Sequence, residues 1–122
     1  MGCRGVRGAI TVDANTREAI LAAAKELLRE MVQANGIVAD EVAFAYFTTT
    51  SDLNAAFPAA AARDMGWIEV PLLNGHEMNV PGSLPMCLRI LLLVNTDKRP
   101  SEIVHIYLKG AQALRPDLAG RK

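Results

Sequence analysis

The feature that most constrains the fold is an imbalance between apolar strands and the helices available to cover them. Residues 42–48 and 88–94 are almost entirely apolar or β-branched, without the alternation expected of a strand with one face in water. Continuous apolar stretches of this kind are typical of sheets that are covered on both faces. The chain has only one long amphipathic helix, which can cover one face. We therefore expect other copies of the chain to cover the second face, in a homo-oligomer.

The long helix is predicted to begin after Asn15 and to end near Gly36. Asn15 is a good N-cap, and Glu18 completes a pair that resembles a capping box. Gly36 suits the position that follows a helix. Its apolar residues recur at helical spacing and form one stripe for the core: Ile20, Ala23, Ala24, Leu27, Leu28 and Met31.

Shorter elements surround this helix. We expect strands at residues 2–12, 42–48, 67–73, 76–80 and 88–94, and a final strand over 105–108 and 112–114, with a potential interruption at Gly110. The pair Asn74-Gly75 is predicted to be the turn of a hairpin, and Pro58 is predicted to start a short helix through Arg63. The pattern indicates an α/β fold of α+β character, with a mixed β-sheet and one long helix. No repeat or linker divides the sequence, so residues 1–122 are expected to form one domain with a loose tail over 116–122.

Charge and composition exclude several classes of protein. Lysine plus arginine equals aspartate plus glutamate, 13 against 13, which argues against a nucleic-acid or anionic-membrane binder. The uninterrupted apolar stretches, such as residues 90–94, are far too short to span a bilayer. The two cysteines and the lack of a visible secretory signal predict a cytoplasmic protein with reduced thiols.

Few residues suggest metal, cofactor or nucleophilic chemistry. His76 and His105 are isolated, and Cys3 and Cys87 lack the spacing of metal ligands. No phosphate-binding loop, dinucleotide fingerprint or nucleophile elbow is present. Cys87, inside an apolar strand, is expected to be a small buried hydrophobe. We therefore predict no metal site and no cofactor.

Arg89 is the residue that most suggests a site. It lies within a strand between Leu88 and Ile90, where a solvated charge is not expected. Burying a guanidinium without a partner costs several kcal/mol. Either an acidic side chain or an anionic ligand must therefore pair with it, and a sheet face at an oligomer interface offers a cleft for such a ligand.

An ordered series of short motifs carries a family resemblance. The motifs are residues 4–12 (RGVRGAITV), 52–53 (DL), 57–59 (FPA), Arg63, 66–67 (GW), 70–71 (VP), 77–78 (EM), Val80, 87–89 (CLR), 96–97 (TD), 105–108 (HIYL) and 114–118 (LRPDL). Each is weak alone, but the series in this order is specific. From residue 4 to about 118 the chain resembles the AroH-type monofunctional chorismate mutases.

The resemblance implies a fold and an activity. The fold would be a homotrimeric pseudo-α/β-barrel, with sheets inside, helices outside and active sites at the subunit interfaces. The reaction would be the isomerisation of chorismate to prephenate, an intramolecular Claisen rearrangement on the route to phenylalanine and tyrosine. That reaction needs no acid, base, nucleophile, metal or cofactor, so it is compatible with the few chemical groups found.

The resemblance also implies roles for individual residues. Arg89 would stabilise negative charge on the breaking ether oxygen, and Arg7 would bind a carboxylate of the substrate. Glu77 would accept a hydrogen bond from the ring hydroxyl, and Tyr107 would donate one to a carboxylate. The other implied substrate-binding residues line or rim the pocket: Phe57, Ala59, Arg63, Leu72, Leu73, Asn74, Gly75, His76, Leu114 and Arg115.

Two positions depart from the family pattern. Asn74 stands where relatives often carry a small thiol or hydroxyl, and Ala60 where some carry a basic residue. Two other functions stay open. One is a trimeric imine/enamine deaminase, which also grips a carboxylate with an arginine, although its motifs are not evident here. The other is a non-catalytic trimeric sensor of an aromatic-pathway carboxylate.

Overall fold

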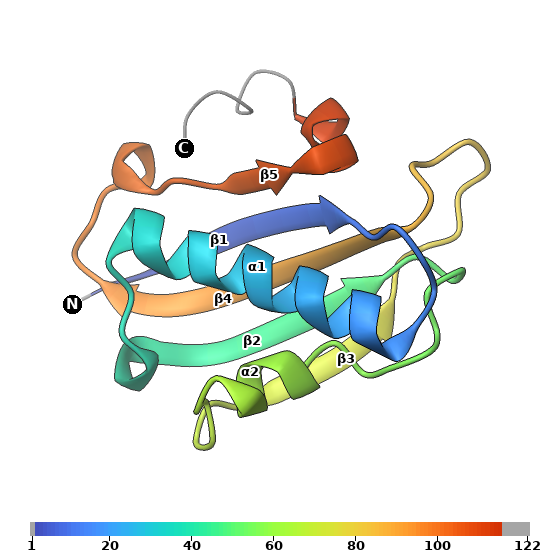
Figure 1. Cartoon of the computed structure of the whole chain (residues 1–122). Helices are drawn as coiled ribbons and strands as arrows, with labels where there is room; N and C mark the ends of the chain where they lie inside the picture. Colours follow the sequence, from blue (N-terminus) through green and yellow to red (C-terminus); the bar gives the residue numbers. More distant parts are fainter. Residues whose placement is uncertain (1, 116–122) are drawn as a thin grey trace.

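The computed structural model describes residues 2–115, which build one five-stranded mixed sheet with its helices on one face (Figure 1). The strand order is β3-β2-β4-β1-β5. Strands β1 and β2 both pair antiparallel with β4, while β3 and β5 add parallel to β2 and β1 at the two edges. The elements are β1 (Gly2–Thr11), α1 (Arg17–Asn35), β2 (Val42–Thr49), α2 (Ala60–Asp64), β3 (Leu72–His76), β4 (Cys87–Thr96) and β5 (Ile106–Leu108), with 3-10 turns at Ala39–Glu41, Pro100–Glu102 and Lys109–Leu114. The predicted α+β class with a mixed sheet and one long helix is confirmed. The predicted tail, residues 116–122, lies outside the described residues.

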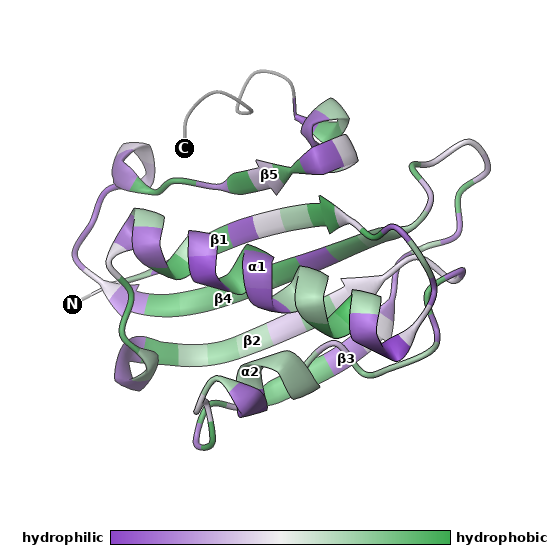
Figure 2. Cartoon of the chain, viewed as in Figure 1, coloured by the Kyte–Doolittle hydropathy of each residue, from purple (hydrophilic) through white to green (hydrophobic). Residues whose placement is uncertain are grey.

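Helix α1 packs along the middle of the sheet with its apolar stripe inward (Figure 2). Leu27 and Met31 are fully buried, and burial of a side chain of this size contributes about 1.5–3 kcal/mol. The helix approaches β1 closely at Gly8, where an added Cβ would lie 2.5 Å from Sδ of Met31. Gly8 therefore allows the side chains of α1 to pack directly against the backbone of β1. Within residues 2–115, no helix is long and apolar enough to cross a membrane.

The start of α1 differs from the prediction by one residue. Thr16 is the N-cap, and its hydroxyl accepts a hydrogen bond from the Ala19 amide at 3.1 Å. The Asn15 side chain instead binds the loop after β2, where its Oδ1 accepts from the Asn54 and Ala55 amides at 3.0 Å each. Both residues are good caps, and the loop provides Asn15 with more partners than the helix end would. The predicted end is confirmed, because Gly36 adopts a left-handed conformation there with φ 62°.

The predicted hairpin at Asn74-Gly75 is wrong. Both residues lie inside β3, which runs parallel to β2 with Asn74 opposite Phe47 and Gly75 opposite Thr48. The glycine serves a close approach and not a turn, since an added Cβ would lie 2.7 Å from the Tyr46 hydroxyl oxygen. Residues 67–70 and 77–80 are therefore irregular segments on either side of one strand.

The end of the chain also differs from the prediction. Strand β5 covers only Ile106–Leu108, and the segment Lys109–Leu114, part of which was expected to be strand, is a 3-10 helix. Lys109 takes a positive φ of 53°, and the Gly110 amide donates to the Thr11 hydroxyl at 3.0 Å. This bend ends the strand, and the hydrogen bond keeps the start of the 3-10 helix at the end of β1.

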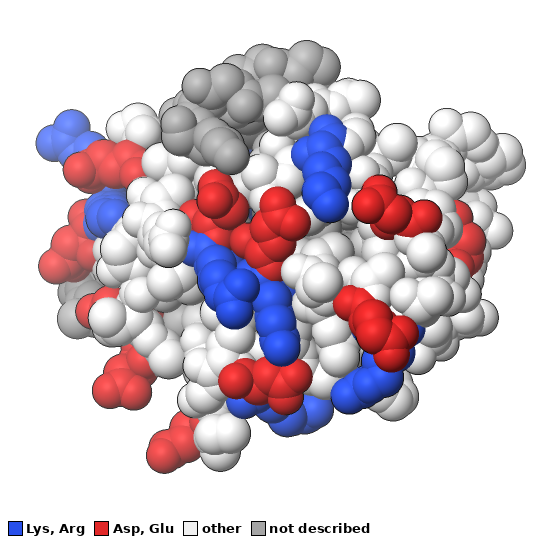
Figure 3. Space-filling model, viewed as in Figure 1, with Lys and Arg blue, Asp and Glu red and all other residues white. Residues whose placement is uncertain are grey.

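The face of the sheet opposite α1 carries the other set of alternating side chains. We call it the open face. Its members include Phe44 and Tyr46 from β2, Leu73 from β3 and Leu91 from β4, which the strand register places side by side. Leu73 is 63% exposed, and Phe44 and Leu91 are each 37% exposed. The helix side differs, because acidic and basic side chains intermingle across it (Figure 3). Within the sheet, the large apolar side chains that are exposed, Phe44, Leu73 and Leu91, therefore belong to the open face.

Asp52 joins the loop after β2 to the start of β4. Its carboxylate accepts from the Thr50 hydroxyl and, at 3.0 Å, from the Met86 amide. The Thr50 hydrogen bond holds the pKa of Asp52 below its usual value of 3.8. Because the pKa of Asp52 is lower in the folded chain than in the unfolded chain, the charged carboxylate stabilises the fold at pH values above the unfolded-state pKa. This stabilisation is lost as the pH falls through the folded-state pKa.

Replacing Asp52 with asparagine is expected to lower Tm by about 3 °C at pH 7, a small effect because the carboxylate is exposed. The difference from wild type should shrink as the pH is lowered below 3.8, which calorimetric scans across this range would measure. Asp13→Asn, at another exposed carboxylate, is the control. A Tm difference that stays constant with pH would contradict the stabilising role of the charged form.

Candidate active site

A hollow of about 310 Å³ lies on the open face. We call it the arginine hollow. Every strand contributes to it or borders it, and its lining combines two cations, one carboxylate and three hydroxyls. The lining residues are Arg7, Gly8, Ala9, Tyr46, Thr48, Glu77, Arg89, Ile90, Leu91 and Tyr107.

Strand register brings these side chains together from distant parts of the sequence. Arg89 in β4 lies opposite Ala9 in β1 and opposite Thr48 in β2. Ala9 in turn lies opposite Tyr107 in β5. Because side chains alternate along a strand, Arg7 and Arg89 share the open face as diagonal neighbours across β1 and β4.

Arg89 is half-buried, and its Nε is fully buried without a hydrogen-bond partner. Within residues 2–115, it forms no ion pair with a carboxylate. Arg4 behaves differently, since its Nε donates to the Lys98 carbonyl at 2.8 Å. A buried donor left without a partner costs about 1–3 kcal/mol, and more when the group is charged. Arg89 therefore presents an unsatisfied cation to the hollow.

Glu77 is held at the edge of the hollow by β2. Its Oε2 accepts a hydrogen bond from the Thr48 hydroxyl, and its backbone amide donates to the Thr49 carbonyl at 2.8 Å. The bond to Thr48 orients the carboxylate and leaves Oε1 able to accept from a ligand. Thr48 was not predicted as a site residue.

The β1–β5 side of the hollow rests on a small apolar cluster. Tyr107, Ala9, Cys87 and Ala111 are buried there, with Leu114 packed against them. Burial raises the pKa of the Cys87 thiol above its ordinary value of 9.0, although nearby Arg89 opposes this shift. Cys87 therefore stays a neutral thiol at pH 7, as predicted for a small buried hydrophobe, and is a poor nucleophile.

Arg7 lies at the rim of the hollow and is exposed. Its backbone amide donates to Nδ1 of His105 at 3.0 Å, which fixes the neighbouring β5 segment and gives that histidine a structural contact. Among residues 2–115, no three histidine, cysteine or acidic side chains gather closely enough to hold a metal ion.

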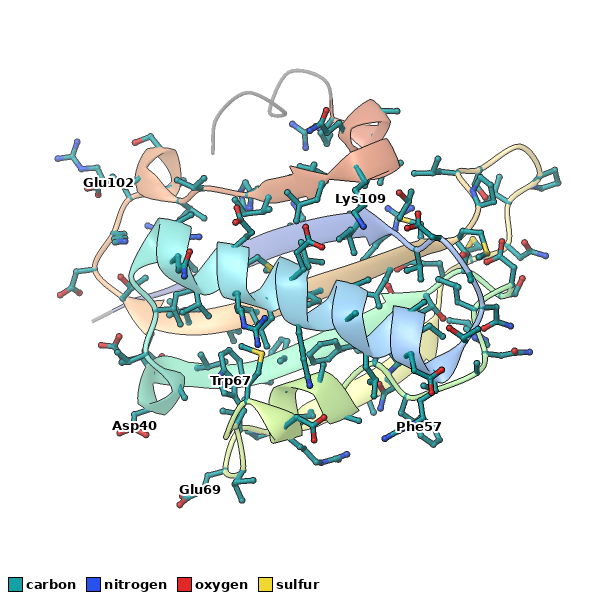
Figure 4. The ribbon with its side chains drawn as sticks, in the orientation of Figure 1. Asp40, Phe57, Trp67, Glu69, Glu102 and Lys109 are labelled. Atoms are coloured by element: carbon teal, nitrogen blue, oxygen red, sulfur yellow. The ribbon has the colours of Figure 1, made fainter. Side chains whose placement is uncertain are left out.

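A second hollow, of about 420 Å³, holds a different part of the predicted site. We call it the phenylalanine hollow. Phe57, Asn74, Gly75 and His76 line it, and Phe57 is 72% exposed, projecting from the loop before α2 (Figure 4). Asn74 is held in place by Ala59, whose amide donates to its Oδ1 at 2.9 Å. Asn74 is larger than the small thiol or hydroxyl residue that relatives often carry at this position. Its side chain thus connects β3 to the segment before α2.

The remaining predicted residues lie outside both hollows. Ala59 is fully buried in the main core, and Leu72 is half-buried against the same core. Leu73 is on the open face, Arg63 is exposed on α2, and Arg115 is half-buried at the end of the described chain. A single chain therefore brings together Arg7, Glu77, Arg89 and Tyr107, but not the group around Phe57.

Sequence reasoning missed Tyr46 and Thr48. Both occupy alternate positions of β2 facing Arg89, so their place in the hollow depends on the register between β2 and β4. Alternation along residues 42–48 offered the signal, but the unbroken apolar character of that stretch concealed which face each residue takes.

Comparison with known proteins gives a consistent result. The profile of the family described as chorismate mutase type I matches residues 3–118. A chorismate mutase AroH of Thermus thermophilus is 53% identical over 116 residues, covering 94% of this chain and 95% of that protein. The corresponding protein of Bacillus subtilis is 41% identical over 120 residues, covering 98% and 94%.

A solved structure supports the same assignment. A chorismate mutase from Clostridium thermocellum superposes with a TM-score of 0.89 at 47% identity, covering 90% of this chain and 98% of that one. The match extends over most of this chain and nearly all of that one. The chain belongs to the type I chorismate mutase family.

Proposed function

We propose that this chain converts chorismate to prephenate and that the arginine hollow is its catalytic centre. The observation that carries the proposal is the buried, unpartnered Nε of Arg89 in a hollow large enough for a small ligand. An anionic oxygen in the hollow would supply the partner that this guanidinium lacks among the acidic side chains of residues 2–115. The product is a precursor of phenylalanine and tyrosine, and we expect this biosynthetic enzyme to act in the cytoplasm.

The reaction asks for charge stabilisation and positioning. In one step the ether C–O bond of chorismate breaks and a C–C bond forms, and no proton is transferred. Negative charge grows on the ether oxygen as its bond breaks, so a fixed cation at that point stabilises the transition state more than the ground state. Arg89 supplies that cation, and its strand position limits how far it moves during the reaction.

The other groups of the hollow hold the substrate in its compact, reactive conformer. Chorismate carries two carboxylates, for which Arg7 provides a guanidinium and Tyr107 a hydroxyl donor. Glu77, oriented by Thr48, accepts from the ring hydroxyl. Restricting a flexible molecule to one conformer contributes to catalysis by removing its conformational entropy before the reaction.

We further propose that the active site is completed by a second protomer in a homotrimer. The predicted substrate-binding residues divide between two separate hollows of one chain, and the open face exposes Phe44, Leu73 and Leu91. Docking the phenylalanine hollow of one copy beside the arginine hollow of the next would cover these apolar side chains. It would also place the exposed Phe57 ring against a bound substrate.

The loss of chorismate absorbance on addition of purified protein tests this function. Prephenate formation without added metal or cofactor is the expected result. Binding of chorismate without turnover would favour the sensor, and hydrolysis of 2-iminopropionate in its place would favour the deaminase. Either of these outcomes would overturn the proposal.

Replacing Arg7 with alanine is expected to raise KM about tenfold or more and to change kcat less, because a charge-assisted bond to a carboxylate contributes about 1.5–3 kcal/mol to binding. Steady-state kinetics would measure the two constants. Arg29→Ala, on the exposed side of α1, is the matched control and should leave both constants unchanged. An unchanged KM in the Arg7 variant would contradict carboxylate binding by this residue.

A further inference from the structure

Tyr46, which lines the arginine hollow, packs closely against Gly75. Tyr46 in β2 leans over Gly75 in β3, so that an added Cβ at Gly75 would lie 2.7 Å from the phenol oxygen, 3.4 Å from Cζ and 3.5 Å from Cε1. The contact with the phenol oxygen is too short for a real Cβ, whereas the two ring contacts are ordinary. Gly75 therefore provides the space that the Tyr46 hydroxyl occupies.

The Tyr46 hydroxyl has no hydrogen-bond partner within residues 2–115, although its ring is half-buried in the lining of the hollow. Buried or half-buried tyrosines usually find a partner for this group. The neighbouring polar group is the Thr48–Glu77 pair, since Thr48 lies directly opposite Gly75. The hydroxyl thus borders the part of the hollow where the Glu77 carboxylate is presented.

We propose that Tyr46 is a further substrate-binding residue, whose hydroxyl donates a hydrogen bond to the ring hydroxyl of a carbocyclic dicarboxylate, and that Gly75 acts as a positioning residue for it. The inference rests on the proposed function, which places the ring hydroxyl at Glu77. Glu77 accepts the proton of the ring hydroxyl while Tyr46 donates to its oxygen. Together they would select a hydroxylated ring over one that lacks this group.

A double-mutant cycle on Tyr46→Phe and Gly75→Ala tests the inference. Tyr46→Phe is expected to raise KM about fivefold with kcat within about twofold, as one neutral hydrogen bond is lost. Gly75→Ala should raise KM to a similar extent in the wild-type background, because its methyl group displaces the phenol oxygen. In the Tyr46→Phe background the same change should have almost no effect, since only ordinary ring contacts remain.

Gly5→Ala is the matched control, a strand glycine on the same face where an added Cβ would meet its nearest atom, Cδ1 of Leu91, at 3.6 Å. It should leave KM unchanged. An unchanged KM in Tyr46→Phe would overturn the inference. Equal effects of Gly75→Ala in both backgrounds would also overturn it, because the glycine would then act through the strand and not through Tyr46.

Binding measurements separate failure of this inference from failure of the proposed function. Calorimetric titration with prephenate should show about fivefold weaker binding by Tyr46→Phe, and the affinity for an analogue without the ring hydroxyl should be the same in both proteins. If wild type binds prephenate but does not rearrange chorismate, the proposed function fails while the titration still decides on Tyr46. If wild type rearranges chorismate and Tyr46→Phe binds prephenate normally, only the inference fails. Wild type that neither binds prephenate nor turns over chorismate would overturn both.

Discussion

Replacing Arg89 with alanine is expected to lower kcat by at least about 10³-fold while leaving the fold and assembly intact. The guanidinium is the one cation of the hollow whose buried Nε lacks a partner within residues 2–115. Removing the guanidinium eliminates an unsatisfied buried donor, so the free energy of unfolding should not decrease. The transition state of the reaction, in contrast, loses the cation that stabilises it. Initial rates of chorismate loss, with circular dichroism and sedimentation as checks, would measure both effects.

Arg29→Ala is the control for this substitution, because that arginine is exposed on α1 and distant from the open face. It should retain wild-type kcat. A correctly assembled Arg89→Ala protein with kcat close to wild type would refute the catalytic role of the guanidinium.

Mixing two inactive variants is expected to restore activity. Arg89→Ala damages the arginine hollow, and Phe57→Asp places a carboxylate in the phenylalanine hollow, where it would repel a dianionic substrate. Each variant alone should lose at least about 10²-fold in activity. If each site of a trimer takes one hollow from each of two protomers, random mixing leaves about one site in four with both hollows intact. Selecting co-expressed protein that carries both tags removes the homotrimers, and each remaining trimer then has one intact site in three, so this protein should recover about a third of wild-type activity.

A second mixture controls for nonspecific rescue. Arg89→Ala combined with Glu77→Ala affects one hollow only, because both side chains line the same hollow of one protomer. No mixed trimer then contains an intact site at an interface between the two variants, so activity should stay low. Failure of the first mixture to regain activity would contradict a shared site, and so would equal recovery in both mixtures.

The parts of the fold that the sequence predicted well depend on local or strongly periodic signals. The apolar stripe of α1 and the left-handed Gly36 define the helix within a few residues, and the stretches at 42–48 and 88–94 correspond to β2 and β4. These signals are sufficient because a continuous apolar stretch and helical spacing of apolar residues are each compatible with few secondary structures. The class of fold follows from them.

The errors arose where distant residues decide a local structure. Asn74-Gly75 has the composition of a hairpin turn, but the glycine is needed beneath Tyr46, a residue 29 positions earlier in the sequence that only the parallel pairing of β2 and β3 brings near. Thr48 was missed as a site residue for the same reason. Local turn propensity carries no information on such pairing.

The chemical groups of the candidate site were easier to predict from the sequence than their arrangement in space. Arg89 stood out because a charge within an apolar strand needs a partner, and the structure leaves its Nε buried and unsatisfied. The division between the two hollows could not be predicted, since it depends on how β3 and the loop before α2 are placed relative to β4. The resemblance grouped the residues by role and did not indicate this division.

The most direct test of the Arg89 role compares two affinities in wild type and in Arg89→Ala. One ligand is a bicyclic dicarboxylate ether that mimics the transition state, and the other is prephenate. If the guanidinium acts on charge that develops in the transition state, the mimic should bind about 10³-fold more weakly to the variant, in parallel with kcat/KM, while prephenate affinity falls by about tenfold at most. Equal losses for both ligands would show that Arg89 merely binds carboxylates, and would contradict the account.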